Sequence, residues 1–258
     1  MAVAAVAVVL SSCIGSPAPT SAPVELTVYA AASLKDALEF SAHAYQVDVP
    51  SVTVTISTDS STALRTQIEH GAPADLFLSA DTTNPQTLVE AGLTSGDAVP
   101  FARNALTIIV PAANPAGIET SADLARAGVK IVAAGDEVPI STYAGQLIDN
   151  LAALPGYPSG YAAAYAGNVV SREDNVRAIV AKIGLGEGDA GIVYATDTLA
   201  ATNVTFVAIP EDTNVYATYA GVVVNASRTV VAAQAFLDWL AGPRGQSILQ
   251  DFGFHPRP

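Results

Sequence analysis

Segments with the patterns of strands and of helices alternate along the chain from residue 25 to the C-terminus. Short apolar runs such as "LTVYAA", "SVTVTIS" and "ADLFLSA" are each followed by a stretch with apolar residues three and four apart. Such alternation is typical of an α/β protein whose mostly parallel sheets carry helices on both faces. The 258 residues are more natural as two lobes than as one.

The same patterns predict where the individual elements lie. Further strands are expected in "NALTIIVPA", "VKIVAA", "AGIVYA", "TFVAIP" and "ATYAGVVV". The expected helices cover residues 34–45, 63–70, 85–91, 121–126, 143–151, 174–183 and 229–241. A loop rich in Gly, Tyr and Pro is expected after residue 151 and extends to residue 167.

The charge of the chain excludes several classes of partner. The formal net charge is −13, from 24 acidic and 11 basic side chains, and Lys and Arg form no cluster. The chain therefore lacks the cluster of basic side chains that a surface for nucleic acid or an anionic membrane requires. We therefore expect no nucleic-acid partner and no direct membrane surface.

The N-terminus carries the only cysteine, in "VAAVAVVLSSCIGSPAPTSAP". An apolar run of signal-peptide length is followed by "LSSC" and a tail rich in Pro, Ser and Ala, which resembles the lipobox of bacterial lipoproteins. The resemblance implies a signal peptide at residues 1–12, a lipid on Cys13, and a tether at residues 13–23. The alternative is a short buried helix with an inert cysteine. The rest of the chain has no other apolar stretch near 20 residues, so we expect an exported, extracytoplasmic protein held by its lipid.

The sequence lacks the parts of a familiar enzyme. Its three histidines, His43, His70 and His255, form no metal-binding pair, and there is no second cysteine, nucleophile elbow or Gly-rich phosphate loop. All three histidines are expected on the surface. We therefore expect neither an enzyme nor a cofactor.

Hydroxyl side chains stand instead where strands lead into helices. Ser33 occupies one such junction, in "VYAAASLKDAL", and Ser60, Ser61 and Thr62 occupy the next. Each is a candidate N-cap, worth about 1 kcal/mol to its own helix. Two junctions at the carboxyl ends of parallel strands also direct free N–H groups and helix dipoles into one crevice, which favours an anion even without Lys or Arg.

Five segments together resemble the molybdate-binding protein family of bacterial molybdate ABC transporters. They are "VYAAASLKDAL", "SSTALRTQIEHGAPADLFLSAD", "GDEVPISTYAGQL", "NVRAIV…GIVYATDT" and "AGPRGQSILQDFGF". The resemblance covers nearly all of the chain after the tether. It implies a two-lobed periplasmic-binding-protein fold of type II with the ligand in the cleft between the lobes.

The resemblance also implies which residues hold the oxyanion. Ser33 and Ser61 match serines of the first lobe that bind the anion, and Ser33 matches one that gives both its hydroxyl and its N–H. From the second lobe, Ile140 and Val176 match backbone N–H donors, and Tyr194 matches a tyrosine that donates its phenolic hydroxyl. The alternative for Tyr194 is an ordinary core tyrosine of a strand. Any metal is molybdenum, carried as molybdate by these same residues.

Two departures from the family pattern bear on the site. The family often has Ala and then Gly where this chain has Ile140 and Ser141, which keeps the N–H donor but bears on the shape of the loop. Asp59 stands one residue before the serine pair, where the family usually has a small residue. A carboxylate in the cleft would oppose a dianion, so we expect Asp59 to face solvent or to cap the helix. Ser60 is expected to support Ser61.

The resemblance implies a receptor that captures molybdate, and tungstate with it, for a membrane permease driven by a separate ATPase. The first lobe is expected to comprise residues 24–102 and 211–258 and the second residues 103–210, with hinge crossings near residues 100–104 and 210–216. The protein is expected to be a monomer. The alternatives are a sulfate or phosphate receptor of the same fold, a hydrolase that uses Ser33 or Ser61, and a structural surface protein.

Overall fold

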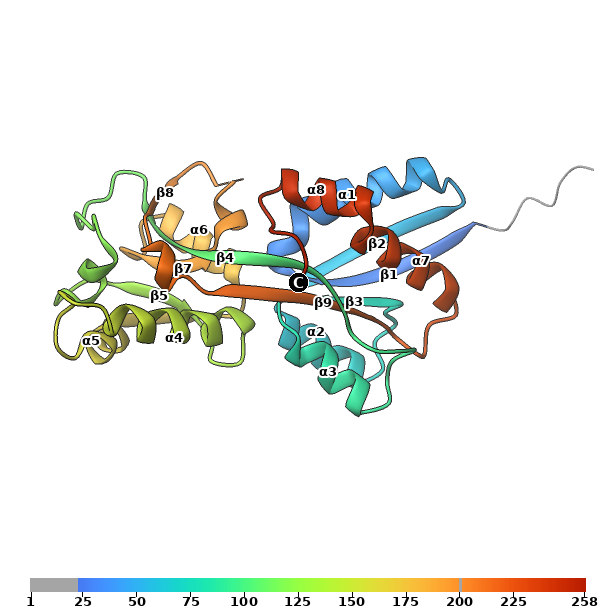
Figure 1. The fold of residues 1–258 in the computed structure, drawn as a ribbon, viewed down its shortest axis with the longest axis horizontal. Coiled ribbons are helices and arrows are strands. Elements are labelled where there is room, and N and C mark those ends of the chain that lie inside the picture. Colours follow the sequence, from blue (N-terminus) through green and yellow to red (C-terminus); the bar gives the residue numbers. More distant parts are fainter. Residues whose placement is uncertain (1–22, 200) are drawn as a thin grey trace, which may run out of the picture.

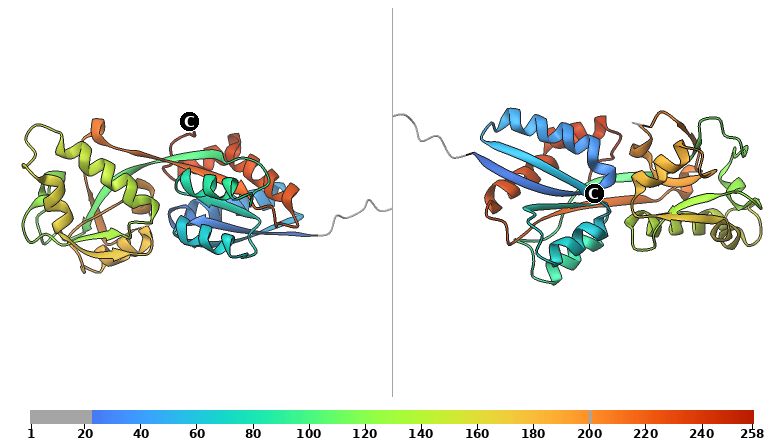
Figure 2. Two further views of the ribbon diagram at one scale, coloured as in Figure 1. Left: turned by 90° about the horizontal axis from the view of Figure 1, so that it is seen from below. Right: turned by 180° about the vertical axis from the view of Figure 1, so that it is seen from behind.

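The computed structural model describes residues 23–199 and 201–258, which form two lobes joined by two long strands. The expected signal peptide, Cys13 and residues 14–22 of the tether lie outside the described residues. The connecting strands are β4 (Val99–Pro111) and β9 (Tyr216–Val223), which cross together from one lobe to the other (Figure 1). Two further views show the same arrangement (Figure 2). The expected two-lobed α/β fold is confirmed.

The sheet of the first lobe contains β1 (Val24–Ala31), β2 (Val52–Asp59) and β3 (Leu76–Ser79). β1 lies between β2 and β3 and runs parallel to both. β9 pairs antiparallel with β3 and then with β4. The expected parallel pairing therefore holds for three strands, whereas the whole sheet is mixed, because the chain returns to the first lobe through β9.

Helices cover both faces of this sheet. On one face lie α1 (Lys35–Asp48), α7 (Val230–Ala241) and α8 (Pro243–Asp251), and on the other lie α2 (Ser61–Glu69) and α3 (Thr83–Glu90) (Figure 1). The period-2 alternation of β3 explains the two layers: Leu76 and Leu78 belong to the core that contains α1 and α7, whereas Phe77 packs with α2 and α3. All three side chains are fully buried.

The second lobe is built from shorter strands. β7 (Gly191–Tyr194) and β8 (Val204–Val207) pair antiparallel with β4, and β5 (Ile131–Ala134) pairs parallel with β6 (Val169–Glu173). Its helices are α4 (Pro139–Ala152), α5 (Tyr161–Gly167) and α6 (Val176–Gly184). Short 3-10 turns complete the described chain: η1 (Ala32–Leu34), η2 (Ser121–Ala125), η3 (Ala195–Thr198) and η4 (Glu211–Thr213).

Two helices and one strand were not expected from the sequence. α5 lies inside the predicted Gly/Tyr/Pro-rich loop, where Gly160 begins it with a φ of +76° and the hydroxyl of buried Tyr161 donates to the carbonyl of Ser121 at 2.6 Å. β6 follows it and pairs with β5. α8 begins with Pro243 at its first position. Each of these elements depends on contacts with distant residues, which local patterns do not contain.

The connecting strands occupy the region in which hinge crossings were expected. β4 contains residues 100–104, and β9 starts at Tyr216, where the second expected crossing ends. Across the junction, Arg103 pairs with Thr218 and Ala105 with Tyr216, whereas Leu106 already pairs with Tyr194 of the second lobe. The exact division into residues 24–102 with 211–258 and residues 103–210 stays a prediction.

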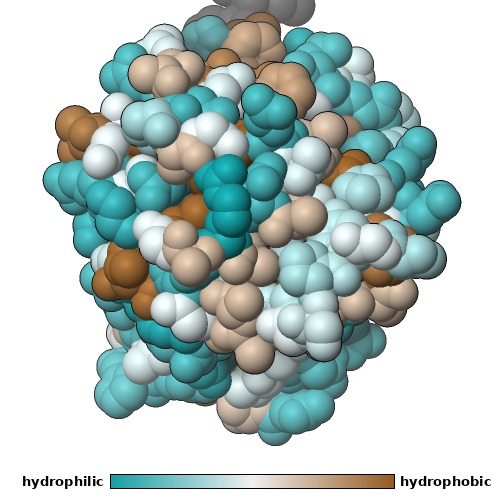
Figure 3. Space-filling view, turned by 90° about the vertical axis from the view of Figure 1, so that its left-hand side faces the viewer, coloured by the Kyte–Doolittle hydropathy of each residue, from teal (hydrophilic) through white to brown (hydrophobic). Residues whose placement is uncertain are grey.

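The outer surface of the second lobe is mixed in character. On the end that faces away from the first lobe, hydrophilic residues alternate with residues of intermediate hydropathy, and the most hydrophobic residues form small separate patches (Figure 3). Within residues 23–199 and 201–258, no helix combines the length and the apolar character that crossing a membrane requires.

Gly221 of β9 provides a test of the packing at the centre of the first lobe. A Cβ at this position would lie 2.6 Å from Leu78 Cδ2 and 2.9 Å from Leu237 Cδ1. We expect Gly221→Ala to lower the free energy of unfolding by about 1 to 3 kcal/mol, because the added methyl overpacks the core. Urea unfolding measures the change. In the control Gly145→Ala, on helix α4, the added Cβ meets nothing within 4 Å, so stability should rise by about 0.5 to 1 kcal/mol. Equal stability of both variants and the parent would contradict the packing.

Candidate functional site

One small cavity between the lobes brings together all five predicted site residues. Ser33 and Ser61 line it from the first lobe, and Ile140, Val176 and Tyr194 line it from the second. The cavity is narrow, and each of these five residues is buried. Its other lining residues are Ala31, Ala32, Asp59, Ser60, Ala80, Val138, Pro139 and Asn175. None of the described residues that line it is a lysine or an arginine.

Three helices begin at this cavity. Ser60 caps α2, and its Oγ accepts from the N–H of Ala63 at 3.3 Å; Asn175 caps α6 in the same way, with Oδ1 accepting from Ala178 at 3.2 Å. α4 begins with Pro139, which has no N–H. Each cap accepts from the third N–H of its helix, which leaves the first two N–H groups of α2 and α6 without an intrahelical acceptor, and the helix dipoles add positive potential at the cavity.

Ser61 is positioned as a hydroxyl donor. It is the first residue of α2, and its Oγ accepts a hydrogen bond from the N–H of Ala80 at 3.0 Å. Because this bond occupies an oxygen lone pair, the hydroxyl hydrogen remains available to a ligand. Among the three candidate N-caps of this junction the cap is Ser60, whereas the hydroxyl of Thr62 donates to the carbonyl of Glu137 across the cleft at 2.6 Å.

Ser33 is not an N-cap, which corrects the expectation for this junction. The 3-10 turn η1 precedes α1, so the N-cap of α1 is Leu34, and no side chain caps either element. The Ser33 Oγ lies instead 2.8 Å from the phenolic oxygen of Tyr219 on β9. The extra turn carries Ser33 away from the start of α1 and toward the connecting strands.

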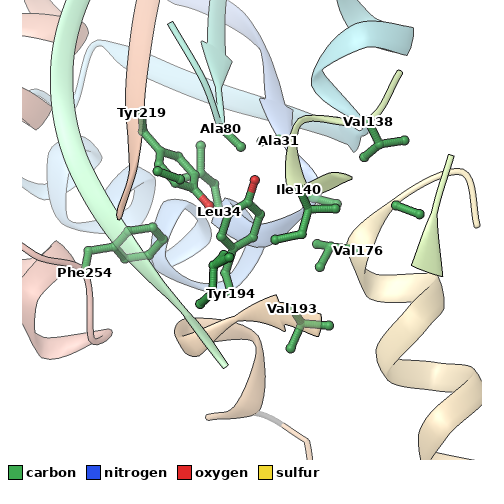
Figure 4. Close-up of a cluster of buried hydrophobic side chains, with 14 of the residues drawn as sticks. Ala31, Leu34, Ala80, Val138, Ile140, Val176, Val193, Tyr194, Tyr219 and Phe254 are labelled. Carbon is green, nitrogen blue, oxygen red and sulfur yellow. The ribbon is translucent and has the colours of Figure 1, made fainter. Parts of the chain in front are cut away.

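Tyr194 ends β7 and its ring is buried between the lobes. Its hydroxyl points toward the space bounded by Ala31, Ala80 and Ile140 (Figure 4). This oxygen is buried and has no hydrogen-bond partner among the described residues. Burial, and next the neighbouring Tyr219, raise the pKa of Tyr194 well above its usual range, so the group stays a neutral donor. An unpaired buried hydroxyl costs free energy, which a ligand in the cavity would recover.

The two departures from the family pattern have clear structural consequences. Ile140 lies in the first turn of α4, and the hydroxyl of Ser141 donates back to the carbonyl of Gly135 at 2.7 Å, which fixes the preceding loop. Asp59 lines the cavity and is not the N-cap of α2, which corrects the expectation that it faces solvent or caps the helix. Its Oδ1 accepts from the N–H of Ser60 at 2.7 Å and from the Asn175 side chain at 3.2 Å. The carboxylate thus joins the caps of α2 and α6 across the cleft.

Arg177 makes further contacts between the lobes that the sequence did not indicate. Its Nε donates to the carbonyl of Ala32 at 2.8 Å, and its Nη2 lies 2.6 Å from Asp36 Oδ2. Arg177 directly follows Val176, so one turn of α6 carries both a cavity-lining residue and this link to the first lobe. The lobes are therefore closed on one another in this structure.

The site offers no machinery for hydrolysis. His43, His70 and His255 are all exposed, as expected, and none of them lines the cavity. Neither Ser33 nor Ser61 is hydrogen-bonded to a base: Ser61 accepts from Ala80, and Ser33 contacts Tyr219. Within the described part of the chain, no three His, Cys, Asp or Glu side chains group in a way that would hold a metal ion.

Asp197 is a buried neighbour of Tyr194, and its shifted pKa predicts how the stability of the protein depends on pH. Burial raises the pKa of this carboxyl to about 7, while Arg177 and the N–H of Tyr194 oppose the rise. The folded protein then holds a proton between about pH 4 and 7 that the unfolded chain releases, so its stability falls as the pH rises through this range. We expect Asp197→Asn, which keeps an acceptor for the Tyr194 N–H, to remove this fall.

Urea unfolding of both proteins at about pH 5 and about pH 8 measures the effect. The matched control is Asp149→Asn, because Asp149 is exposed on α4. The same fall in stability with pH in Asp197→Asn as in the parent would show that the Asp197 carboxyl does not hold the proton.

Comparisons with known proteins identify the family of this chain. The family model described as bacterial extracellular solute-binding protein matches residues 26–255. The chain is 34% identical over 241 residues to the molybdate-binding protein ModA of Mycobacterium bovis, covering 93% of this chain and 88% of the relative.

Two solved structures share the fold. The periplasmic molybdate-binding protein of Azotobacter vinelandii superposes with a TM-score of 0.73 at 23% identity, covering 89% of this chain and 98% of the other. The sulfate-binding protein SubI of Mycobacterium tuberculosis superposes with a TM-score of 0.77 at 22% identity, covering 90% and 87%. Proteins of this family bind solutes and are not enzymes, which confirms the expectation for this chain. The chain belongs to the bacterial extracellular solute-binding proteins and, among them, to the molybdate-binding protein family.

Proposed function

We propose that this chain captures molybdate, and tungstate with it, in the cavity between its lobes. One observation carries the proposal: hydroxyl donors and helix N-termini from both lobes converge on a buried space lined by no lysine or arginine. Ser33, Ser61 and Tyr194 supply hydroxyls, and the first-turn N–H groups at Ile140 and Val176 supply the remaining donors. Such donors bind an anion in spite of the net charge of −13.

The chemistry of the donors supports a fully ionised anion. Phosphate keeps a proton at neutral pH and needs an acceptor, whereas the five groups proposed to bind the anion are all donors. Sulfate matches the donors but is smaller, so it cannot reach all of them in a fixed cavity, and each unmet buried donor costs about 1 to 3 kcal/mol. Tungstate has nearly the size of molybdate and should bind similarly.

Because the donors come from both lobes, the bound anion would also stabilise the closed arrangement of the lobes. The anion would bind one lobe in an open form and then draw the other onto it, with β4 and β9 as the hinge. The contacts of Arg177 with Ala32 and Asp36 would add to the closed form. Closure and loss of water oppose binding, so the measured affinity will be far below the sum of the hydrogen bonds.

The family supports the rest of the proposal. The relatives named as molybdate-binding proteins support delivery of the anion to the permease of an ABC transporter, driven by its ATPase. We place the protein outside the cytoplasm, held to the membrane by a lipid on Cys13 after removal of residues 1–12, and acting as a monomer. Mass spectrometry of the protein from membranes, with and without Cys13→Ala, tests the lipid.

Thermal unfolding with excess molybdate, tungstate, sulfate or phosphate tests the ligand. An anion at about 100 times its Kd adds roughly 2.7 kcal/mol, or roughly 5 to 10 °C for a chain of this size. We expect this rise with molybdate and tungstate only, relative to chloride at equal ionic strength. A rise with sulfate or phosphate alone would move the assignment to that anion, and no rise at all would contradict the proposed site.

Removal of one hydroxyl tests the place of binding. We expect Ser61→Ala to weaken molybdate binding by about tenfold to a hundredfold, since a hydrogen bond to a charged ligand is worth about 1.5 to 3 kcal/mol. Isothermal titration calorimetry gives the affinity. Ser41→Ala is the matched control, because Ser41 is a fully buried serine of the same lobe that does not line the cavity. Equal affinities of the two variants would exclude Ser61 from the site.

Asp59 favours a second candidate, a phosphate receptor, because its carboxylate lines the cavity and is the acceptor that a protonated phosphate needs. The affinities of Asp59→Asn for molybdate and for phosphate distinguish a molybdate receptor from a phosphate receptor. For the molybdate receptor, loss of a negative charge beside the anion should leave molybdate binding equal or tighter. For a phosphate receptor, the same change should weaken phosphate binding.

A further inference from the structure

A series of hydrogen-bonded polar side chains runs from the second lobe through both connecting strands to Ser33. Thr196 of η3 receives a hydrogen bond from Asn104 Nδ2 at 2.8 Å, and the same nitrogen donates to the phenolic oxygen of Tyr219 at 3.3 Å. Tyr219 in turn lies 2.8 Å from Ser33 Oγ. Asn104 is on β4 and Tyr219 is on β9, and both are fully buried.

The number of hydrogens on each group determines which side chain donates and which accepts along this series. Asn104 Nδ2 carries two hydrogens, one for Thr196 and one for Tyr219. Since the Tyr219 oxygen accepts from Asn104, its single hydrogen is free to donate to Ser33 Oγ. Ser33 then accepts from Tyr219, and its own hydroxyl hydrogen is left for the cavity.

Ser33 could donate to Tyr219 in two ways. The Tyr219 oxygen could accept from both Ser33 and Asn104, which would leave the buried Tyr219 hydrogen without a partner, at a cost of about 1 to 3 kcal/mol. Alternatively, the Asn104 amide could be turned over, so that its oxygen accepts from Thr196 and Tyr219 while Ser33 donates to Tyr219, leaving only lone pairs toward an anion. In the observed orientation one carbonyl oxygen, Asn104 Oδ1, lacks a partner among the described residues. The turned amide would instead place two N–H hydrogens at that unpartnered position. One unpaired acceptor costs less than two unpaired donors, so the observed orientation is favoured.

Packing keeps Tyr219 in this arrangement. Its ring makes edge contacts with Tyr194, Phe254 and Phe101, with ring centres 5.6, 5.5 and 6.2 Å apart. Tyr219, Tyr194 and Phe254 lie together in one cluster of buried side chains (Figure 4). Burial raises the pKa of Tyr219 well above its usual range, so the hydroxyl keeps the hydrogen that it donates.

We propose that Tyr219 and Asn104 are positioning residues that turn the hydroxyl of Ser33 into an obligate donor to the bound anion. Neither residue touches the anion; both act through Ser33, which borders the cavity and Tyr219 at once. This inference rests on the proposed function, because it concerns the donor polarity of the same site. It also assigns a role in anion affinity to the two connecting strands.

Calorimetric titration of molybdate into Tyr219→Phe tests the proposal. We expect affinity to fall about tenfold, because Ser33 loses the donor that fixes its hydroxyl. The matched control is Tyr161→Phe, which removes another buried tyrosine hydroxyl, bonded to Ser121 within the second lobe and away from the cavity. That control should lose stability without loss of affinity.

A double-mutant cycle separates positioning from general damage. Once Ser33→Ala has removed the hydroxyl, adding Tyr219→Phe should change affinity by less than about twofold. A tenfold loss in both backgrounds would overturn the proposal, as would unchanged affinity in the single variant. If Tyr219→Phe does not fold by circular dichroism, Asn104→Ala in the same cycle gives the answer, since it removes the hydrogen that directs Tyr219.

The parent protein distinguishes failure of this inference from failure of the proposed function. If the parent binds molybdate and Tyr219→Phe binds it equally well, only the positioning role is overturned. If the parent binds none of molybdate, tungstate, sulfate and phosphate, the anion site itself is overturned, and the positioning role with it.

Discussion

Hydrogen-bond donors without partners, facing one buried space, are the constraint on which the rest of this structure depends. Leaving such groups unpaired away from water costs free energy, so the fold must hold them firmly and a ligand must match them. Ser60 and Asn175 cap two helices while leaving the first N–H groups free, and the Ala80 N–H holds the oxygen of Ser61. These contacts fix the directions of the donors before a ligand arrives, and fixed donors bind an anion with little reorganisation.

The connecting strands do more than join the lobes. β4 and β9 form part of the sheet of the first lobe, and β4 continues into the second lobe, where β7 and β8 pair with it. The same two strands carry Asn104 and Tyr219, so the segment about which the lobes would move also orients a donor of the site. A change in the angle between the lobes would therefore alter the hydroxyl of Ser33. In the proposed mechanism, these hydrogen bonds link ligand binding to closure.

Much of the fold could be predicted from the sequence, because it depends on local signals. Apolar runs and helical spacing predicted β1, β2, β3 and their helices, and the resemblance brought together five residues that do line one cavity. The features that the sequence did not predict depend on contacts between residues far apart in the chain. Ser33 looks like an N-cap in sequence, but its partner Tyr219 is 186 residues away. α5 depends on Tyr161 reaching Ser121, and no local pattern contains that contact. Arg177 and Asp197 were missed for the same reason, since their neighbours come from other elements.

Anomalous X-ray diffraction from crystals grown with molybdate tests most directly whether a tetrahedral anion lies among donors of both lobes. Molybdenum scatters anomalously, so its position is found without assumptions about the surrounding protein. We expect one strong peak in the cavity, with the anion oxygens within hydrogen-bond distance of Ser33, Ser61 and Tyr194 and of the N–H groups of Ile140 and Val176. A peak only elsewhere on the protein, or no peak in crystals grown at saturating molybdate, would contradict the proposed site.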